Sequence, residues 1–252
     1  MDALVHALFY FGIKTTNMPK AFISELKQGI AHLFYPVLCE GCKQPLVAPE
    51  TILCISCLLE MPQTKYHNLP NNDTALLFAG RIPFINATTY AWFTNDGLLQ
   101  LLLHGLKYKG KKEIGVFLGQ QFALSLLDTD WIHTIDLIIP VPLHPKKKAI
   151  RGYNQSMMIA NGISNILKKP ATEEILLRIK HTESQTNKSR TERLKNMEGA
   201  FKINPLKELK NTHILLCDDV LTTGATLEAC ANILLLQENI KISIATVGIA
   251  VS

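Results

Sequence analysis

Two neighbouring acids and a turn of small residues form the most chemically suggestive group in this sequence. Asp218 and Asp219 follow the apolar segment 214–217, which predicts a short buried strand. The residues 227–236 then show the apolar spacing of a helix. Between the acids and this helix lies a turn formed by Thr222, Thr223, Gly224, Ala225 and Thr226.

This order of residue types suits a phosphorylated sugar. In open α/β sheets, ligands bind beyond the carboxyl ends of the strands. The free N–H groups at a helix N-terminus attract phosphate, while paired carboxylates accept sugar hydroxyls and a hard cation such as Mg²⁺. The implied ligand carries a ribose and a 5′-phosphate. The competing interpretation is an ordinary strand and helix, with Thr222 or Thr223 as the N-cap, but capping accounts for one threonine only.

A second group of residues predicts a site for an anion such as pyrophosphate. A basic segment follows the expected strand 136–141, and arginine offers phosphate a planar fork of donors. The alternative is a solvated basic turn before a helix. The candidate anion-binding residues are Lys107, His144, Arg151 and Gly152.

The polar stretch 178–201 lies between the basic segment and the acid pair, and it contains few apolar residues. Basic surface loops are common, but this position favours a mobile lid that excludes water from a reactive sugar centre. The residues expected to act from this lid are Gln185, Arg190 and Arg193.

Four cysteines follow the pattern C-x2-C-x11-C-x2-C, which predicts a structural Zn²⁺ site with four thiolate ligands. Two disulfides are the alternative, but no export signal is evident, and paired Cys-x-x-Cys motifs in a reducing compartment favour metal. The expected ligands are Cys39, Cys42, Cys54 and Cys57. Cys217 and Cys230 are expected to be inert core residues.

Strand and helix patterns alternate from residue 88 onward, which predicts an α/β fold with a mostly parallel sheet covered by helices on both faces. A small zinc-binding module precedes it. The expected division is an N-terminal extension at 1–19, a helix plus four-cysteine module at 20–62, a linker at 63–87 and the α/β domain at 88–252.

Composition narrows the class of protein further. The chain has 252 residues, 47% of them hydrophobic and 19% charged, as in globular proteins. No apolar run is long enough for a membrane span, and no secretory signal is evident, so we expect a cytoplasmic protein. Residues 104–195 carry sixteen Lys or Arg and eight Asp or Glu. This excess reflects either ordinary solubility or an anionic partner, such as pyrophosphate or nucleic acid.

Taken in order, these motifs resemble the ComF family of bacterial competence proteins over residues 20–251. The resemblance rests on the paired Cys-x2-Cys motifs, Leu106–Gly110, Pro140–His144, Arg151–Gln155, Thr182 with Gln185, Arg193 with Asn196, and Asp218–Thr226. Departures are small: Tyr153 stands where Phe is common, and Ser189 where Leu is frequent.

The resemblance implies a type I phosphoribosyltransferase fold that binds 5-phosphoribosyl-1-diphosphate (PRPP) with Mg²⁺. It places the ribose on Asp218 and Asp219 and the 5′-phosphate on the threonine turn. It also implies a role in natural transformation, where single-stranded DNA is handled with a helicase partner. The enzymatic reaction would be phosphoribosyl transfer. The alternative is a non-catalytic accessory protein that binds single-stranded DNA or the helicase and reuses the fold. The zinc module either docks a protein partner or serves stability alone.

Overall fold

The computed structural model describes residues 36–180 and 199–250, which fall into two compact units, Met1–Cys54 and Ile55–Ser252. The strands are β1 Ala87–Phe93, β2 Leu137–Pro140, β3 Leu176–Arg178, β4 Phe201–Ile203, β5 His213–Leu221 and β6 Lys241–Ala250. The helices are α3 Ile55–Leu59, η2 Tyr66–Asn68, α4 Asp73–Phe78, α5 Leu98–Tyr108, α6 Lys112–Leu126, η3 Asp130–Thr134, α7 Pro145–Arg151, α8 Gln155–Leu167 and α10 Ala225–Leu234. Within these residues no helix is both long and apolar enough to cross a membrane.

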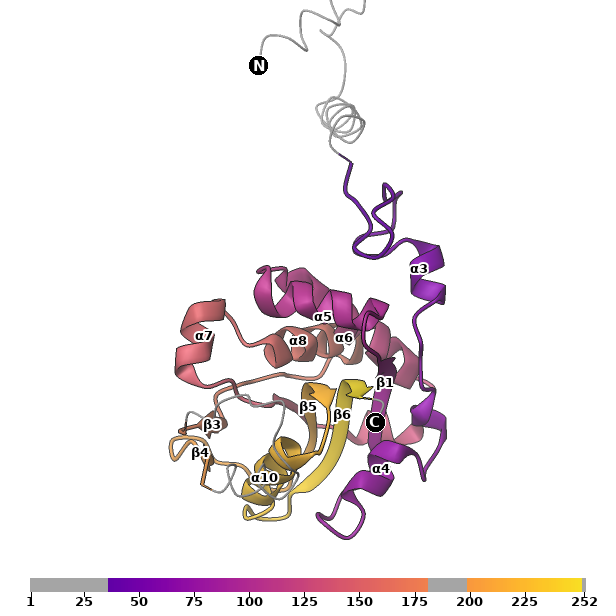
Figure 1. The fold of residues 1–252 in the computed structure, drawn as a ribbon. Coiled ribbons are helices and arrows are strands. Elements are labelled where there is room, and N and C mark those ends of the chain that lie inside the picture. The colour runs from indigo at the N-terminus through magenta and orange to yellow at the C-terminus, as the bar shows by residue number, and fades with distance from the viewer. Residues whose placement is uncertain (1–35, 181–198, 251–252) are drawn as a thin grey trace, which may run out of the picture. The chain divides into compact units, whose positions relative to one another are not determined.

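A parallel sheet of four strands, in the order β1-β6-β5-β2, is the centre of the second unit (Figure 1). Its inner strands β5 and β6 are rich in Ile, Leu, Val and Ala, because both of their faces are covered. A separate antiparallel pair, β3 and β4, packs its buried residues Leu176 and Phe201 into the same core as α10.

Helices cover both faces of this sheet, as the alternation of side chains along β5 shows. Ile214 and Leu216 belong to the core that also contains Phe78 of α4 and Leu227 of α10. Cys217 points to the other face, where its sulfur lies 3.9 Å from the carbonyl oxygen of Ser156 in α8. Figure 1 shows α5, α6 and α8 on the side of β5 and β6 opposite α4 and α10. The expected fold class is therefore confirmed.

The chain leaves β2 and β5 in opposite directions along the sheet. After β2 it passes through α7 and α8 and returns at Ala171, which bridges Ile138 on the outer side of β2. After β5 it passes through α10 to β6, on the opposite side of β5. Since such crossovers are right-handed, α8 and α10 must lie on opposite faces. The ends of β2 and β5 therefore form the switch point where open sheets bind ligands.

Three segments differ from their expected structure. Residues 63–87, expected to be a linker, contain η2 and α4, and Phe78 of α4 is fully buried in the core. The basic segment after β2, expected to be a loop, forms the short helix α7. Strand β5 continues through the two acids to Leu221 because β6 still pairs with it there. The expected N-terminal extension, the first helix and the lid with Gln185, Arg190 and Arg193 lie outside the described residues.

Candidate functional site

The two acids lie where β5 loses one of its neighbours. Pairing with β2 ends at Cys217, whose carbonyl accepts from the Val141 amide at 2.8 Å, whereas pairing with β6 continues to Leu221. Asp218 and Asp219 therefore sit in a regular strand but border the open end of the switch point. The opening arises because β5 extends beyond its parallel neighbour β2. From the sequence alone, the acids were expected only to follow the end of a strand.

Asp218 is half-buried and accepts hydrogen bonds from its neighbours. Its Oδ1 accepts hydrogen bonds from the Ser156 hydroxyl at 2.8 Å and from the Asp219 amide at 2.9 Å. Burial raises the pKa of the Asp218 carboxyl well above its usual range, and the nearby Asp219 charge raises it further. The Ser156 hydrogen bond and Lys107 act in the opposite direction. The site thus concentrates negative charge at a cost in stability, which is typical of functional sites.

Asp219 of strand β5 is paired with a lysine from helix α5. The Lys107 ammonium, near the end of α5, lies 2.7 Å from Asp219 Oδ2. The second oxygen of Asp219 accepts the Val220 amide at 2.7 Å. Anion binding by Lys107 stays a prediction, and in the structure its ammonium compensates the charge of the second acid.

The turn after β5 enters helix α10 through a glycine with a positive φ. Gly224 has φ 74° and ψ −3°, and it is the N-cap of α10. Thr222 is exposed at the tip of the turn, whereas Gly224 and Ala225 are buried. Ala225 opens a helix of ten residues, so the turn lies at the positive end of the helix dipole. Val220 and Leu221, the last residues of β5, separate the acid pair from the five residues of the predicted phosphate turn.

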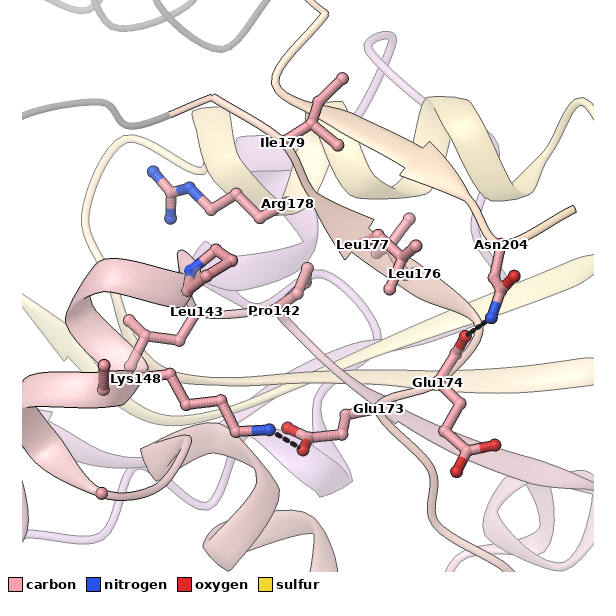
Figure 2. Close-up of a pocket in the computed structure, with 13 residues that line it drawn as sticks. Pro142, Leu143, Lys148, Glu173, Glu174, Leu176, Leu177, Arg178, Ile179 and Asn204 are labelled. Carbon is pink, nitrogen blue, oxygen red and sulfur yellow. Dashed lines mark hydrogen bonds and ion pairs between the residues drawn. The ribbon is translucent and has the colours of Figure 1, made fainter.

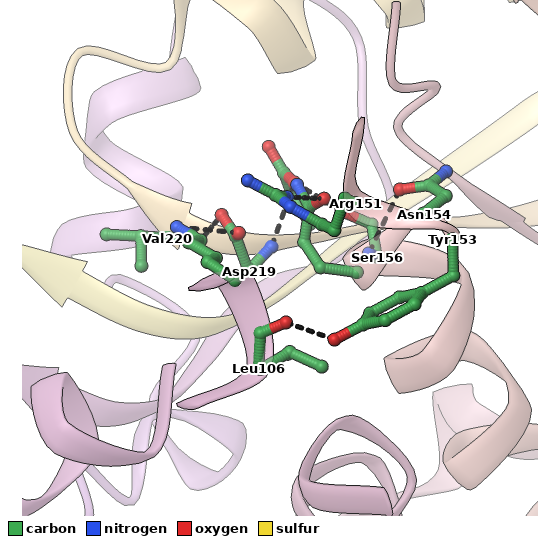
Figure 3. Close-up of polar contacts among 10 residues, drawn as sticks. Leu106, Arg151, Tyr153, Asn154, Ser156, Asp219 and Val220 are labelled. Carbon is green, nitrogen blue, oxygen red and sulfur yellow. Dashed lines mark hydrogen bonds and ion pairs between the residues drawn. The ribbon is translucent and has the colours of Figure 1, made fainter. Parts of the chain in front are cut away.

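Residues 151–156 join three elements at the switch point. The Tyr153 hydroxyl donates to the Leu106 carbonyl of α5, and the Asn154 side chain donates to the Val141 carbonyl at 3.1 Å. Asn154 also caps α8 by accepting from the Ser156 amide at 3.1 Å. This motif therefore fixes the end of β2 against α5 and α8 and brings Ser156 to Asp218. Figure 3 shows the contact between Tyr153 and Leu106. Sequence reasoning assigned it to the ligand and missed Ser156.

Two of the predicted anion-binding residues terminate helix α7. The His144 ring accepts from the Lys146 amide at 3.2 Å as the N-cap, and Gly152, with φ +84°, is the C-cap. Arg151, also expected to bind an anion, donates to the Gln155 side chain, and its guanidinium lies 5.9 Å from the centre of the Tyr108 ring.

Three cations converge beside α7. Burial lowers the pKa of the Lys147 ammonium, and the nearby charges of Arg178 and Arg151 lower it further. Burial also lowers the pKa of the Arg178 guanidinium, which Asp218 partly offsets. Lys147 belongs to the basic segment that the sequence assigned to an anion such as pyrophosphate. Arg178 was not assigned such a role, because only the pairing of β3 with β4 brings it to Lys147.

A cavity of about 810 Å³ opens between α7 and β3 (Figure 2). Its walls are mostly apolar, and Lys148 pairs with Glu173 at one side while Asn204 donates to the Glu174 carbonyl at another. Pro142 and Arg178 also line it, so it adjoins the end of β2. Asp218, Asp219 and the threonine turn are not among its lining residues.

The four predicted zinc ligands lie together. The sulfur atoms of the paired Cys-x2-Cys motifs are all within 4.8 Å of one another. Burial raises the pKa of the Cys39 thiol. Hydrogen bonds from backbone amides, first that of Cys54, outweigh this effect and lower the pKa to about 6. Four close sulfurs with amide support are the donor set that tetrahedral Zn²⁺ requires, so the cluster is compatible with structural zinc. Cys217 and Cys230 are buried in the core, and burial raises the pKa of both thiols.

Comparisons with known proteins find relatives of this chain. Residues 154–252, within the second unit, match the family model of the phosphoribosyl transferase domain. Competence protein F of Haemophilus influenzae is 33% identical over 140 residues, covering 54% of this chain and 61% of that protein. DNA utilization protein YhgH of Escherichia coli is 28% identical over 215 residues, covering 81% and 92%. Competence protein ComFC of Bacillus subtilis is 29% identical over 143 residues, covering 57% and 56%.

The resemblance to the ComF family is thereby confirmed. The chain is homologous to proteins named competence protein F, ComFC and YhgH, and it combines a phosphoribosyl transferase domain with a four-cysteine cluster. The match to competence protein F spans less than two thirds of that protein, whereas the match to YhgH spans most of it.

The raised pKa of Asp218 predicts a specific dependence of stability on pH. A carboxyl whose pKa is higher in the folded state destabilises the fold progressively as pH rises from its unfolded value, about 3.9, through its folded value. Asp218→Asn should therefore raise the melting temperature at neutral pH and reduce the loss of stability on going from pH 5 to pH 8. Thermal unfolding over this range measures both effects. Glu208→Gln, at an exposed carboxyl, is the control, and equal pH slopes for Asp218→Asn and wild type would contradict the prediction.

Proposed function

We propose that the protein binds PRPP with Mg²⁺ at the switch point between β2 and β5. One observation carries this proposal: two adjacent carboxylates border the open end of the sheet and lead directly into a glycine turn at a helix N-terminus. The carboxylates suit the ribose hydroxyls, and the turn from Thr222 to Thr226 suits the 5′-phosphate. Together these groups match a ligand that carries hydroxyls and a phosphate on one sugar.

The acid pair also fits a hard divalent cation. Asp219 Oδ2 is buried, and Lys107 is its one charged partner within the described part of the chain. Asp218 has a raised pKa because two acids share this buried end, so an additional positive charge would stabilise its ionised form. Carboxylate oxygens are the ligands that Mg²⁺ prefers. When bound, Mg²⁺ would supply charge neutralisation for the pyrophosphate group.

The pyrophosphate belongs on the cationic side of the site. Of the predicted anion-binding residues, Arg151 is the one whose positive charge lies near those of Lys147 and Arg178. Lys107 contributes by holding Asp219, while His144 and Gly152 shape α7. The reaction that this arrangement suits is displacement of pyrophosphate at the anomeric carbon, with the cations stabilising the charge that develops on the leaving group.

The names of the relatives suggest the biological setting. They are called competence proteins and DNA utilization proteins, and we propose that this protein likewise acts in DNA uptake during natural transformation. The cytoplasm is the expected compartment, because paired Cys-x2-Cys motifs favour metal binding over disulfides where conditions are reducing.

A second candidate function is binding of single-stranded DNA, either directly or with a helicase partner, without catalysis. Tyr108 favours it, since this ring is 71% exposed and lies next to Arg151 at the edge of the cationic group. An exposed aromatic ring beside cations can stack on a base while the cations contact phosphates. Tyr153 is less suited to stacking, because its hydroxyl is bonded to the Leu106 carbonyl.

The four-cysteine cluster is proposed to hold one structural Zn²⁺ ion. Four protein ligands leave no open position on the metal, so the site would stabilise its fold and take no part in catalysis. This role is compatible with either function of the second unit.

Calorimetry with PRPP and Mg²⁺ tests the main proposal. The zinc-loaded protein should bind PRPP when Mg²⁺ is present, and Asp219→Asn should weaken binding by about tenfold or more, because it removes charge from the cation site. Glu208→Gln should bind as wild type does. Undetectable binding by a folded, zinc-loaded protein would remove the proposal.

Titration of fluorescent single-stranded DNA at several salt concentrations tests the second function. If Arg151 contacts a phosphate, Arg151→Gln should make the salt dependence shallower by about 0.7 in log–log slope. Competition by PRPP with Mg²⁺ would show that both ligands share one site. An affinity that does not vary with salt would exclude phosphate contacts and this function with them.

Metal analysis tests the zinc site. Wild-type protein should retain close to one equivalent of zinc, whereas Cys54→Ser should lose it and make residues 39–57 sensitive to protease, because metal binding supplies much of the folding energy of such modules. Cys230→Ala, which removes a core thiol, should keep its zinc. Full zinc retention by Cys54→Ser would show that Cys54 is not a ligand.

A further inference from the structure

Arg81 joins the C-terminus of α4 to the turn that precedes α10. Gly80, with φ +72°, reverses the chain after α4, and Arg81 folds back along the helix. Its Nη1 donates to the Leu77 carbonyl at 2.8 Å and to the Thr223 carbonyl at 3.2 Å. Its Nη2 pairs with Glu228 in the first turn of α10. Only 12% of the Arg81 side chain is exposed, so these contacts are made with little competition from water.

The Thr223 carbonyl determines where the next amide points. A trans peptide is planar, so the C=O of Thr223 and the N–H of Gly224 face opposite ways. The dihedral angles of Gly224, φ 74° and ψ −3°, match the third position of a type II turn. Glycine also accepts the alternative in which this peptide is rotated by half a turn. The sequence of the turn therefore leaves the direction of the Gly224 N–H open, and the contact with Arg81 selects one direction.

Helix α4 supports the same peptide by direct contact. A Cβ atom at Gly224 would lie 2.4 Å from Leu77 Cδ2 and 2.9 Å from Phe78 Cε1, so only glycine allows α4 to pack this close. The turn thus rests on the end of α4, with its carbonyl directed toward that helix and its amide directed away from it.

Arg81 also balances the charge at the start of α10. Glu228 lies in the first turn of this helix, where a carboxylate stabilises the helix but repels an anionic ligand. Pairing with Arg81 neutralises that carboxylate. Both effects of Arg81 increase the attraction of the turn for an anion.

We infer that Arg81 is a positioning residue of the phosphate turn: by holding the Thr223 carbonyl it directs the Gly224 N–H toward the bound phosphate group. The inference rests on the proposed function, because the anion is taken to be the 5′-phosphate of a ribose. It adds a residue that follows α4, within the segment 63–87 that the sequence suggested to be a linker.

Ribose 5-phosphate with Mg²⁺ is the probe that isolates this turn from the pyrophosphate side. Calorimetry should show affinities about tenfold weaker for Arg81→Gln and Arg81→Lys than for wild type, since lysine keeps the charge but lacks the fork that reaches two carbonyls and a carboxylate. Glu228→Gln retains the carbonyl contacts and should bind at least as tightly as wild type. Lys241→Gln, at the opposite end of the sheet, removes one exposed charge and serves as the control.

The amide resonance of Gly224 provides a readout that a merely structural role would not move. In wild type it should shift downfield when ribose 5-phosphate binds, and in Arg81→Gln this shift should be lost. A folded Arg81→Gln with wild-type affinity and a wild-type Gly224 shift would overturn the inference. Should Arg81→Gln fail to fold, wild-type affinity in Arg81→Lys would overturn it instead.

Failure of the proposed function gives a different result. Wild-type protein would then not bind ribose 5-phosphate at all. The orientation of the peptide would still be measurable without ligand, because Arg81→Gln should move or double the Gly224 resonance. An unchanged resonance in the ligand-free variant would overturn the inference independently.

Discussion

The confinement of two adjacent carboxylates at the end of β5 is the constraint on which the rest of the site depends. Burial and mutual repulsion raise the pKa of Asp218, and each acid is stabilised by a different partner. Ser156 at the start of α8 donates to Asp218, and Lys107 at the end of α5 pairs with Asp219. The start of α8 and the end of α5, on one face of the sheet, therefore both lie at the acid pair. A ligand with hydroxyls and a cation would further compensate the negative charge of the two acids.

Residues 151–156 hold these two helices at the acid pair. Tyr153, Asn154 and Ser156 bond respectively to α5, to the end of β2 and to Asp218. These residues connect the three elements that surround the acids, so they maintain the opening at the switch point. A motif that the sequence assigned to an anion thus also holds the end of β2 against α5 and places Ser156 at Asp218.

The opposite face of the sheet supports the threonine turn. There α4 packs against Gly224, and Arg81 bonds to the Thr223 carbonyl. The acid pair and the turn are neighbours in sequence, yet they are held by helices from different faces, because β2 and β5 lead into crossovers of opposite direction. Each half of the site is consequently stabilised by its own core.

The sequence by itself determined the strands and helices with clear periodicity, the α/β class, the four-cysteine cluster and the acid pair with its turn. These features are local, since spacing along the chain brings their residues together. It did not determine α4, because a helix of only six residues has too little periodicity to stand out. It also did not determine the roles of Ser156, Lys107, Arg178 and Arg81 at the acids and the turn. Those contacts join residues far apart in the chain, so only the order of strands and the direction of the crossovers decided them.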